Sequence, residues 1–218
     1  ANGGEELRRV LSSTPHGYVV KPFGRGQLEA AVELGLLRWR SERTRKEREK
    51  WLELMAYEDP LTGLMNRRAF DDHATRYLAL AKRRRTLLGL IYLDLVGFKA
   101  INDGFGHEAG DEVLAAVARR LEAGARGSDL VCRMGGDEFV VLLPDVDGWS
   151  AAMEVAHRLD RELREPITAA GSSLKVRADM GVALYPADGS SVDALLRSAD
   201  RSLYDAKGGR VGSGVAGS

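Results

Sequence analysis

The chain has 218 residues, 44% of them hydrophobic, which is enough for one full domain with an appendage. Lysine plus arginine equals aspartate plus glutamate at 32 each, so the chain as a whole has no net charge that would attract nucleic acid or an anionic membrane. The single cysteine, Cys132, excludes an internal disulfide, and its apolar neighbours indicate a buried thiol. No apolar run reaches the roughly 18 residues of a membrane span and no signal peptide is visible, so we expect a cytoplasmic protein.

Residues 1–37 end in GYVVKPFGRGQLEAAVELGLL, which predicts a short strand, a turn at Lys21-Pro22 and an amphipathic helix. Leu28, Val32 and Leu36 fall on one face of that helix. The segment resembles the last strand and helix of a response-regulator receiver domain, in which Lys-Pro follows the last strand. Because such a domain carries its phosphoacceptor aspartate much earlier, we expect a C-terminal remnant that accepts no phosphoryl group. An ordinary strand, turn and helix is the alternative.

Residues 38–56 begin with the charged run RWRSERTRKEREK, which continues the helix without a breaker and predicts a helical linker. A heptad pattern can be drawn along it, but its middle is polar, so a coiled coil would be weak there and a solvated helix is the alternative. The heptad positions are Leu34, Leu37, Ser41, Thr44, Arg48, Trp51 and Met55. Basic and acidic side chains interleave, which favours a spacer over a nucleic-acid-binding arm.

After a turn at Asp59-Pro60, the sequence predicts a helix with Asn66 as its N-cap, followed by alternating strands and helices. Their order, βαββαβ, predicts an α+β domain with a ferredoxin-like, palm-type antiparallel sheet covered by helices. Residues 211–218 are rich in glycine and serine and predict a flexible tail. The expected elements are strands at Leu87–Leu95, Asp129–Met134, Phe139–Pro144 and Ser173–Tyr185, and helices at Gly110–Ala123, Ser150–Glu165 and Val192–Lys207.

The segment Arg133–Pro144, RMGGDEFVVLLP, places two acidic residues after two glycines at the tip of an apolar hairpin. Asp137 and Glu138 therefore stand where one strand begins. In a βαββαβ sheet the first and third strands are antiparallel neighbours, so Asp94, near the end of the first, should lie beside Asp137. Carboxylate oxygens suit Mg²⁺ or Mn²⁺, and such a site indicates nucleotide chemistry. The alternative is that Asp94 merely ends its strand.

The pentapeptide GGDEF in this setting resembles the signature of the GGDEF family of diguanylate cyclases. The resemblance covers Tyr57–Arg210, which we interpret as a GGDEF domain. It implies a bacterial second-messenger enzyme that condenses two GTP into cyclic di-GMP and two pyrophosphates across a homodimer, because each domain holds one GTP. Further segments match in family order and spacing: LTGLMNRRAF, the strand with Asp94, FKAINDGFGHEAGD (Phe98–Asp111) and ADRSLYDAK (Ala199–Lys207).

The resemblance also implies how the acidic residues act. Asp94, Asp137 and the backbone carbonyl of Leu95 would bind the metal ions. Glu138 would assist at the metal and at the sugar. Asp94, Asp137 and Glu138 are therefore the expected catalytic carboxylates.

Further residues are implied to bind GTP. Asn102 and Asp111 would contact guanine, whose N1 and N2 hydrogens suit a carboxylate acceptor. Taken singly, each of these two is more typical of a turn or capping residue than of a base contact. Lys99 and Lys207 would neutralise the triphosphate. We expect Phe98–Asp111 to form a glycine-rich loop that opens a helix at Gly110.

A regulatory site is implied by RGSD, in which Arg126 and Asp129 match the family's inhibitory RxxD site for its own product, cyclic di-GMP. Arginine can pair with phosphate or stack on guanine, and aspartate can accept hydrogen bonds from the guanine edge. Arg158, on the following helix, is the expected secondary arginine. An exposed salt bridge within the loop is the alternative.

Three departures from the family pattern bear on catalysis. Val96 stands where the family usually has a second aspartate, Asp179 replaces a usual serine, and Arg210 lies one residue early in the closing segment. None removes an expected metal ligand, but together they put the catalytic rate in question.

Two other functions remain open. One is a regulatory module that binds GTP or cyclic di-GMP, because REPITAAGSSLKVRADMGVALYPADG resembles GGDEF domains that precede a phosphodiesterase EAL domain. The other is an interaction domain without a ligand, which the intact acidic residues disfavour.

Overall fold

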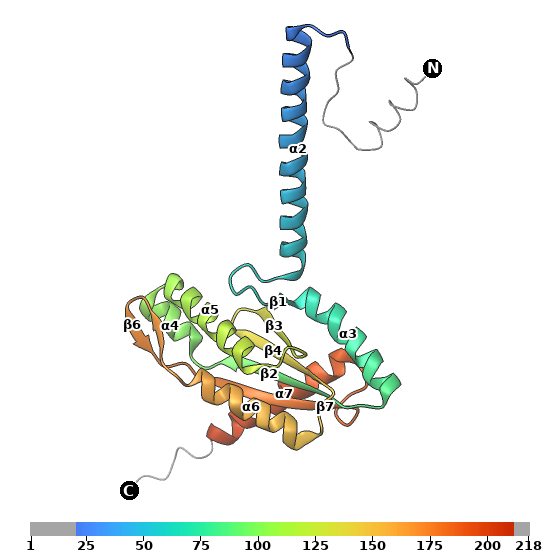
Figure 1. The fold of residues 1–218 in the computed structure, drawn as a ribbon. Helices are drawn as coiled ribbons and strands as arrows, with labels where there is room; N and C mark the ends of the chain where they lie inside the picture. Colours follow the sequence, from blue (N-terminus) through green and yellow to red (C-terminus); the bar gives the residue numbers. More distant parts are fainter. Residues whose placement is uncertain (1–20, 212–218) are drawn as a thin grey trace. The chain divides into compact units, whose positions relative to one another are not determined.

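The computed structural model describes the backbone of residues 21–211 and the side chains of residues 21–48 and 57–203 (Figure 1). The chain divides into two compact units, Ala1–Leu54 and Met55–Ser218. The predicted strand GYVV and most of the predicted C-terminal tail lie outside the described residues. No helix in the described part of the chain is long and apolar enough to cross a membrane.

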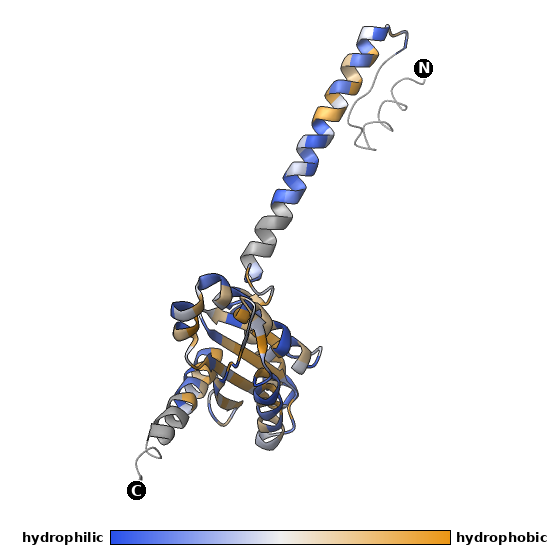
Figure 2. Ribbon diagram, turned by 90° about the vertical axis from the view of Figure 1, so that its left-hand side faces the viewer, coloured by the Kyte–Doolittle hydropathy of each residue, from blue (hydrophilic) through white to orange (hydrophobic). Residues whose placement is uncertain are grey.

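The first unit contains most of α2 (Arg25–Tyr57), a single helix of 33 residues. The predicted receiver helix and the predicted linker are therefore one continuous helix. Ion pairs one turn apart support it, with 2.8 Å between Arg25 and Glu29 and 2.8 Å between Arg43 and Glu47. In Figure 2, the coloured part of α2 has its apolar residues in the N-terminal half of the helix. Their large side chains are exposed: Leu28, Val32, Leu34, Leu36, Leu37 and Trp39.

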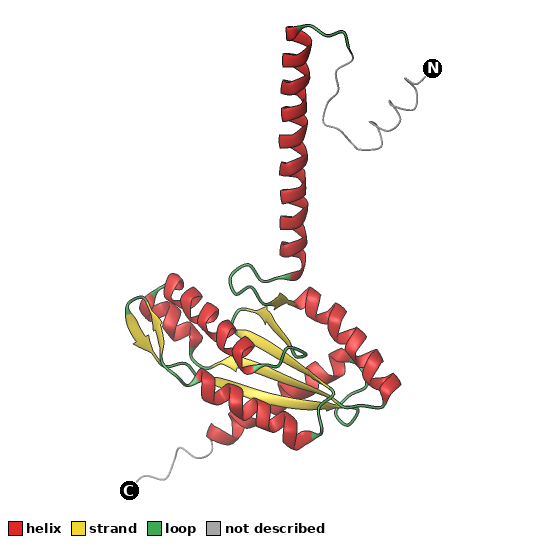
Figure 3. Ribbon diagram, viewed as in Figure 1, coloured by secondary structure: helices red, strands yellow, loops and turns green. Residues whose placement is uncertain are grey.

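The second unit is built on a mixed sheet whose strand order, within the described residues, is β1-β3-β4-β2-β7 (Figure 3). The first and third predicted strands are antiparallel neighbours, as expected, and the α+β fold is confirmed. Only β1 runs parallel to its neighbour β3; the other pairs of this sheet are antiparallel. The strands are β1 (Met65–Asn66), β2 (Leu88–Leu95), β3 (Leu130–Gly135), β4 (Glu138–Pro144) and β7 (Ala178–Tyr185).

Helices cover both faces of this sheet. One face packs against α5 and α6 and the other against α3 and α7, because successive residues of a strand point to opposite faces. The first core includes Ile91, Leu93, Phe139 and Val141 with Leu121 and Leu159. The second includes Leu90, Val140 and Leu142 with Phe70 and Leu195. The helices are α3 (Arg67–Arg84), α4 (Phe98–Phe105), α5 (His107–Gly124), α6 (Trp149–Leu163) and α7 (Val192–Val211).

The helix predicted after Asp59-Pro60 begins as expected. Asn66 is the N-cap of α3, and its side chain accepts a hydrogen bond of 3.0 Å from the Ala69 amide. The prediction of a loop at Phe98–Asp111 is wrong. This segment is the helix α4, followed by α5 from His107, and the two helices meet at Gly106, whose φ of 87° ends the first.

The long strand predicted at Ser173–Tyr185 is also wrong. The chain forms a separate hairpin, β5 (Ile167–Ala169) with β6 (Ser172–Leu174), and enters the main sheet only at β7. Ala170 and Gly171 both have positive φ, 48° and 71°, as a two-residue hairpin turn requires. Apolar and polar residues keep alternating through the break, so the sequence pattern does not mark it.

Candidate active site

A row of acidic residues crosses the sheet where β2 ends. Asp94 on β2 lies opposite Glu138 on β4 and opposite Asp179 on β7. Residues directly opposite in antiparallel strands project to the same face, which here is the face covered by α3 and α7. Glu138 is exposed, Asp94 is half-buried and Asp179 is 7% exposed. The departure at position 179 therefore stands in register with an expected metal ligand.

Asp137 lies in the turn before β4, one residue earlier than the strand itself. Its carbonyl accepts a hydrogen bond of 3.2 Å from the Leu95 amide, so the turn is tied to the end of β2. The positive φ of Gly135 (145°) and Gly136 (55°) shapes this turn. The backbone thus brings the three expected metal ligands, Asp94, Leu95 and Asp137, to one place.

These ligands supply two carboxylates and one carbonyl. Among the described residues, no group of three or more histidine, cysteine, aspartate or glutamate side chains gathers as a metal cage. Mg²⁺ typically takes one or two carboxylates and completes its shell with water and substrate phosphates. The donor set at Asp94 and Asp137 therefore fits Mg²⁺ shared with a nucleotide.

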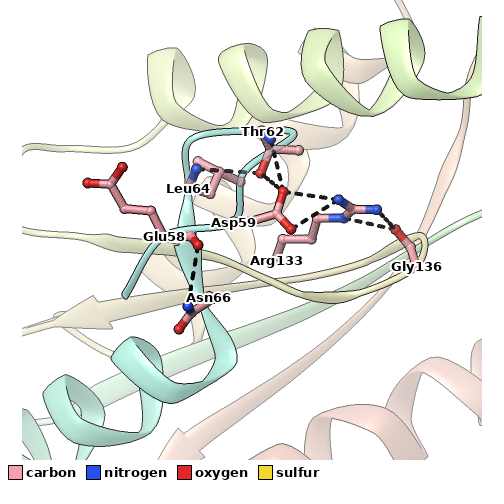
Figure 4. A network of polar contacts seen from close by, with 7 residues as sticks. All are labelled: Glu58, Asp59, Thr62, Leu64, Asn66, Arg133 and Gly136. Carbon is pink, nitrogen blue, oxygen red and sulfur yellow. Dashed lines mark hydrogen bonds and ion pairs between the residues drawn. The ribbon is translucent and has the colours of Figure 1, made fainter. Parts of the chain in front are cut away.

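Arg133 holds the turn from its other side (Figure 4). Its Nε and Nη2 donate to the carbonyl of Gly136 at 3.0 and 2.8 Å, and its Nη1 donates to the two carboxylate oxygens of Asp59 at 3.0 and 3.1 Å. The side chains of Arg133 and Asp59 are only 12% and 19% exposed. The Asp59 Oδ1 also accepts from the amide and hydroxyl of Thr62, at 2.9 and 2.7 Å. We call Asp59, Thr62, Arg133 and Gly136 the hairpin clamp.

The hairpin clamp sets the ionisation of Asp59. Burial raises the pKa of this carboxyl, but hydrogen bonds from Thr62 and Arg133 and the arginine charge outweigh burial and leave the pKa below its usual value. The sequence predicts no role for Arg133 and only a turn for Asp59. They lie 74 positions apart, and nothing in a single sequence pairs them.

The expected guanine contacts lie where α4 meets α5. Asn102 is on α4, and Asp111 follows Gly110 near the start of α5. Gly110 is buried, and a Cβ there would overlap the Asn102 side-chain oxygen and lie 3.2 Å from the Phe98 ring. The missing side chain of Gly110 therefore lets the Asn102 amide rest against α5, one residue from Asp111.

The two expected phosphate-binding lysines are on helices that border this end of the sheet. Lys99 is exposed in the first turn of α4, two residues beyond the glycine that precedes the helix. Lys207 belongs to α7, but its side chain lies outside the described residues, as does that of Arg210.

Two of the three expected inhibitory residues border a separate cavity of about 390 Å³. Arg126 and Asp129 line it together with two acidic side chains, Glu58 and Glu122. The Arg126 amide donates to Asp129 Oδ2 at 2.7 Å, and no ion pair within the described part of the chain joins the two side chains. Arg158 does not line the cavity; its Nε donates to the Gly124 carbonyl at 3.0 Å.

Comparison with known proteins identifies the family. A family model described as "Diguanylate cyclase, GGDEF domain" matches residues 56–211. The chain is 40% identical over 153 residues to the diguanylate cyclase TpbB of Pseudomonas aeruginosa, covering 70% of this chain and 35% of TpbB. It is 40% identical over 156 residues to the cyclic di-GMP phosphodiesterase NbdA of the same organism, covering 72% of this chain and 20% of NbdA. The chain thus spans about a third or less of the length of these curated relatives.

Solved structures agree with the sequence relatives. The GGDEF domain of TpbB superposes with a TM-score of 0.68 at 39% identity, covering 70% of this chain and 90% of that one. The coiled coil and GGDEF domain of DgcB from Caulobacter crescentus, in complex with c-di-GMP, gives a TM-score of 0.69 at 29% identity, covering 84% of this chain and 95% of that one. The chain therefore belongs to the GGDEF family of diguanylate cyclase domains.

Proposed function

We propose that residues 57–210 act as a diguanylate cyclase that condenses two GTP into cyclic di-GMP and two pyrophosphates. The observation that carries the proposal is the register of β2 and β4, which sets Asp94 opposite Glu138 while the Leu95 amide bonds to the Asp137 carbonyl. The same end of β2 leads into α4, which carries Asn102.

In each half-reaction, the 3′-oxygen of one GTP bonds to the α-phosphorus of the other. The bond from that phosphorus to the bridging oxygen breaks, and pyrophosphate leaves. Glu138 accepts the proton of the attacking hydroxyl. Asn102 and Asp111 bind guanine and so fix the nucleotide relative to the carboxylates. Asp94, Asp137 and the Leu95 carbonyl would hold Mg²⁺, which supplies charge neutralisation at the triphosphate when bound.

One domain provides half of this site, so the reaction needs a second copy of the chain. The apolar side chains of α2 offer a way to hold that copy, because a long helix gains stability when such residues are buried against a partner. The similarity to a solved structure that contains a coiled coil and a GGDEF domain supports pairing through α2. We therefore propose a homodimer.

The cavity at Arg126 and Asp129 supports product inhibition. The Arg126 side chain is exposed and forms no ion pair with Asp129, so its guanidinium is available to a phosphate. We propose that cyclic di-GMP binds here and that Arg158 assists from α6.

A regulatory role is the second candidate. NbdA, a phosphodiesterase by its name, is as similar to this chain as the cyclase TpbB. Val96 also leaves the end of β2 without the second acidic residue expected of the family. A regulatory module would bind GTP or cyclic di-GMP and catalyse nothing.

Incubation with Mg²⁺ and GTP at high protein concentration, followed by chromatographic product analysis, separates the two candidates. We expect cyclic di-GMP and pyrophosphate, and we expect Asp137→Asn to abolish both. Asp72→Asn, an exposed carboxylate on α3, is the matched control and should retain activity. Tight GTP binding without turnover would contradict the cyclase and favour the regulatory module.

A further inference from the structure

Tyr92 lies beside the candidate active site, although no motif in the sequence indicates it as a site residue. It lies on β2 two residues before Asp94, so the two side chains share a face of the sheet. Tyr92 is opposite Val140, and Asp94 is opposite Glu138, so Tyr92 and Glu138 are diagonal neighbours on adjacent strands. Such neighbours lie about 7–8 Å apart along the backbone, within reach of an aromatic side chain.

On β7, no side chain stands opposite Tyr92, because its partner there is Gly181. A Cβ at Gly181 would meet the Ala199 carbonyl and the Leu203 amide, so the backbone of α7 lies directly on that strand. Tyr92 itself is half-buried and packs against the core between the sheet, α3 and α7. Its ring is therefore held by packing, which leaves its hydroxyl in a defined position.

Across this diagonal, the Tyr92 hydroxyl is within hydrogen-bonding reach of the Glu138 carboxylate. A carboxylate only accepts hydrogen bonds, so the phenol hydroxyl of Tyr92 is the donor. Glu138 is exposed and follows a turn that contains Gly136.

We propose that Tyr92 is a positioning residue for Glu138: from the central strand β2, its hydroxyl holds the exposed carboxylate at the start of β4 in the orientation that the reaction needs. This inference rests on the proposed cyclase function for its catalytic consequence. The hydrogen bond itself does not depend on turnover.

Tyr92→Phe removes the hydroxyl and keeps the ring. We expect kcat to fall about tenfold, the order of one lost charge-assisted hydrogen bond, while the KM for GTP stays within about twofold because no substrate contact is removed. Tyr185→Phe is the matched control, because Tyr185 packs against the same core at the far end of β7. It should change neither constant.

A second measurement needs no activity. Without nucleotide, we expect Tyr92→Phe to lower the thermal midpoint by about 2–4 °C in the wild-type background and by nothing further in a Glu138→Ala background. If the wild-type chain shows no turnover, the proposed cyclase function is wrong. The comparison of Tyr92→Phe in the wild-type and Glu138→Ala backgrounds would still decide whether Tyr92 holds Glu138. If Tyr92→Phe matches Tyr185→Phe in both measurements, the inference is overturned.

Discussion

Removing the guanidinium of the hairpin clamp tests how much the turn depends on it. Arg133→Met keeps an unbranched apolar stem but deletes the bonds to Gly136 and Asp59. Each hydrogen bond to a charged group contributes about 1.5–3 kcal/mol. Asp59 would keep its two bonds from Thr62 and is 19% exposed, so it would not become an isolated buried charge. We therefore expect a loss of about 2–3 kcal/mol, less than the ~3–5 kcal/mol for breaking a fully buried pair.

A loss of this size is easy to measure. In a domain of about 150–250 residues, 1 kcal/mol moves the thermal midpoint by about 2–4 °C, so Arg133→Met should lower it by about 4–12 °C. Calorimetry or circular dichroism would record the shift. Arg164→Met is the control, because it breaks an ion pair with Asp160 whose arginine is 53% exposed, and it should leave the midpoint unchanged within error.

A double-mutant cycle with Asp59→Asn isolates the pair itself. If Arg133 and Asp59 act together, the combined variant should be less destabilised than the sum of the single ones. The reasoning would be refuted if Arg133→Met unfolds at the same temperature as Arg164→Met, or if the effects of the two clamp substitutions simply add.

Three further predictions concern pH, the base and the product. The folded-state pKa of Asp59 lies below its ordinary value of 3.8. The stability that ionised Asp59 contributes is therefore complete above that ordinary value and is lost as the pH falls through the folded-state pKa. Denaturant titrations should show the free energies of unfolding of the wild type and of Arg133→Met converging under acid conditions. Gly110→Ala should displace the Asn102 side chain and weaken GTP binding about tenfold by calorimetry, and unchanged affinity would argue against Asn102 as a base contact. Arg126→Ala should raise the cyclic di-GMP concentration needed for half-inhibition at least about tenfold. Arg161→Ala, an exposed arginine on α6, should not, and equal inhibition in both variants would remove the assigned site.

The main strands of the sheet could be predicted because each is marked by an apolar run of its own. Runs such as Leu87–Leu95 and Phe139–Pro144 are apolar enough to be buried strands, and the order βαββαβ then fixes which of them are neighbours. That inference placed Asp94 beside the glycine-glycine turn, and the register of β2 and β4 agrees with it.

What the sequence could not show depends on partners that are distant or very short. β1 has two residues, Met65–Asn66, and exists because it pairs with β3, so no run of its own marks it. The helix α4 could not be predicted because its consecutive residues Asn102, Asp103 and Gly104 are typical of turns rather than of helices. The hairpin clamp needs Asp59 and Arg133 to meet across the fold, and charge alone does not pair residues.

Gly181 and Gly136 illustrate two different reasons for a glycine. Gly136 has a positive φ, so its substitution would strain the backbone locally, at the turn that carries the carboxylates. Gly181 has no such φ; it is needed because α7 lies against it. A methyl group there would push α7 away from β7 and so tilt this 20-residue helix, which carries Lys207. In the proposed cyclase, the position of Lys207 thus depends on the close approach of α7 to the edge strand β7 at Gly181.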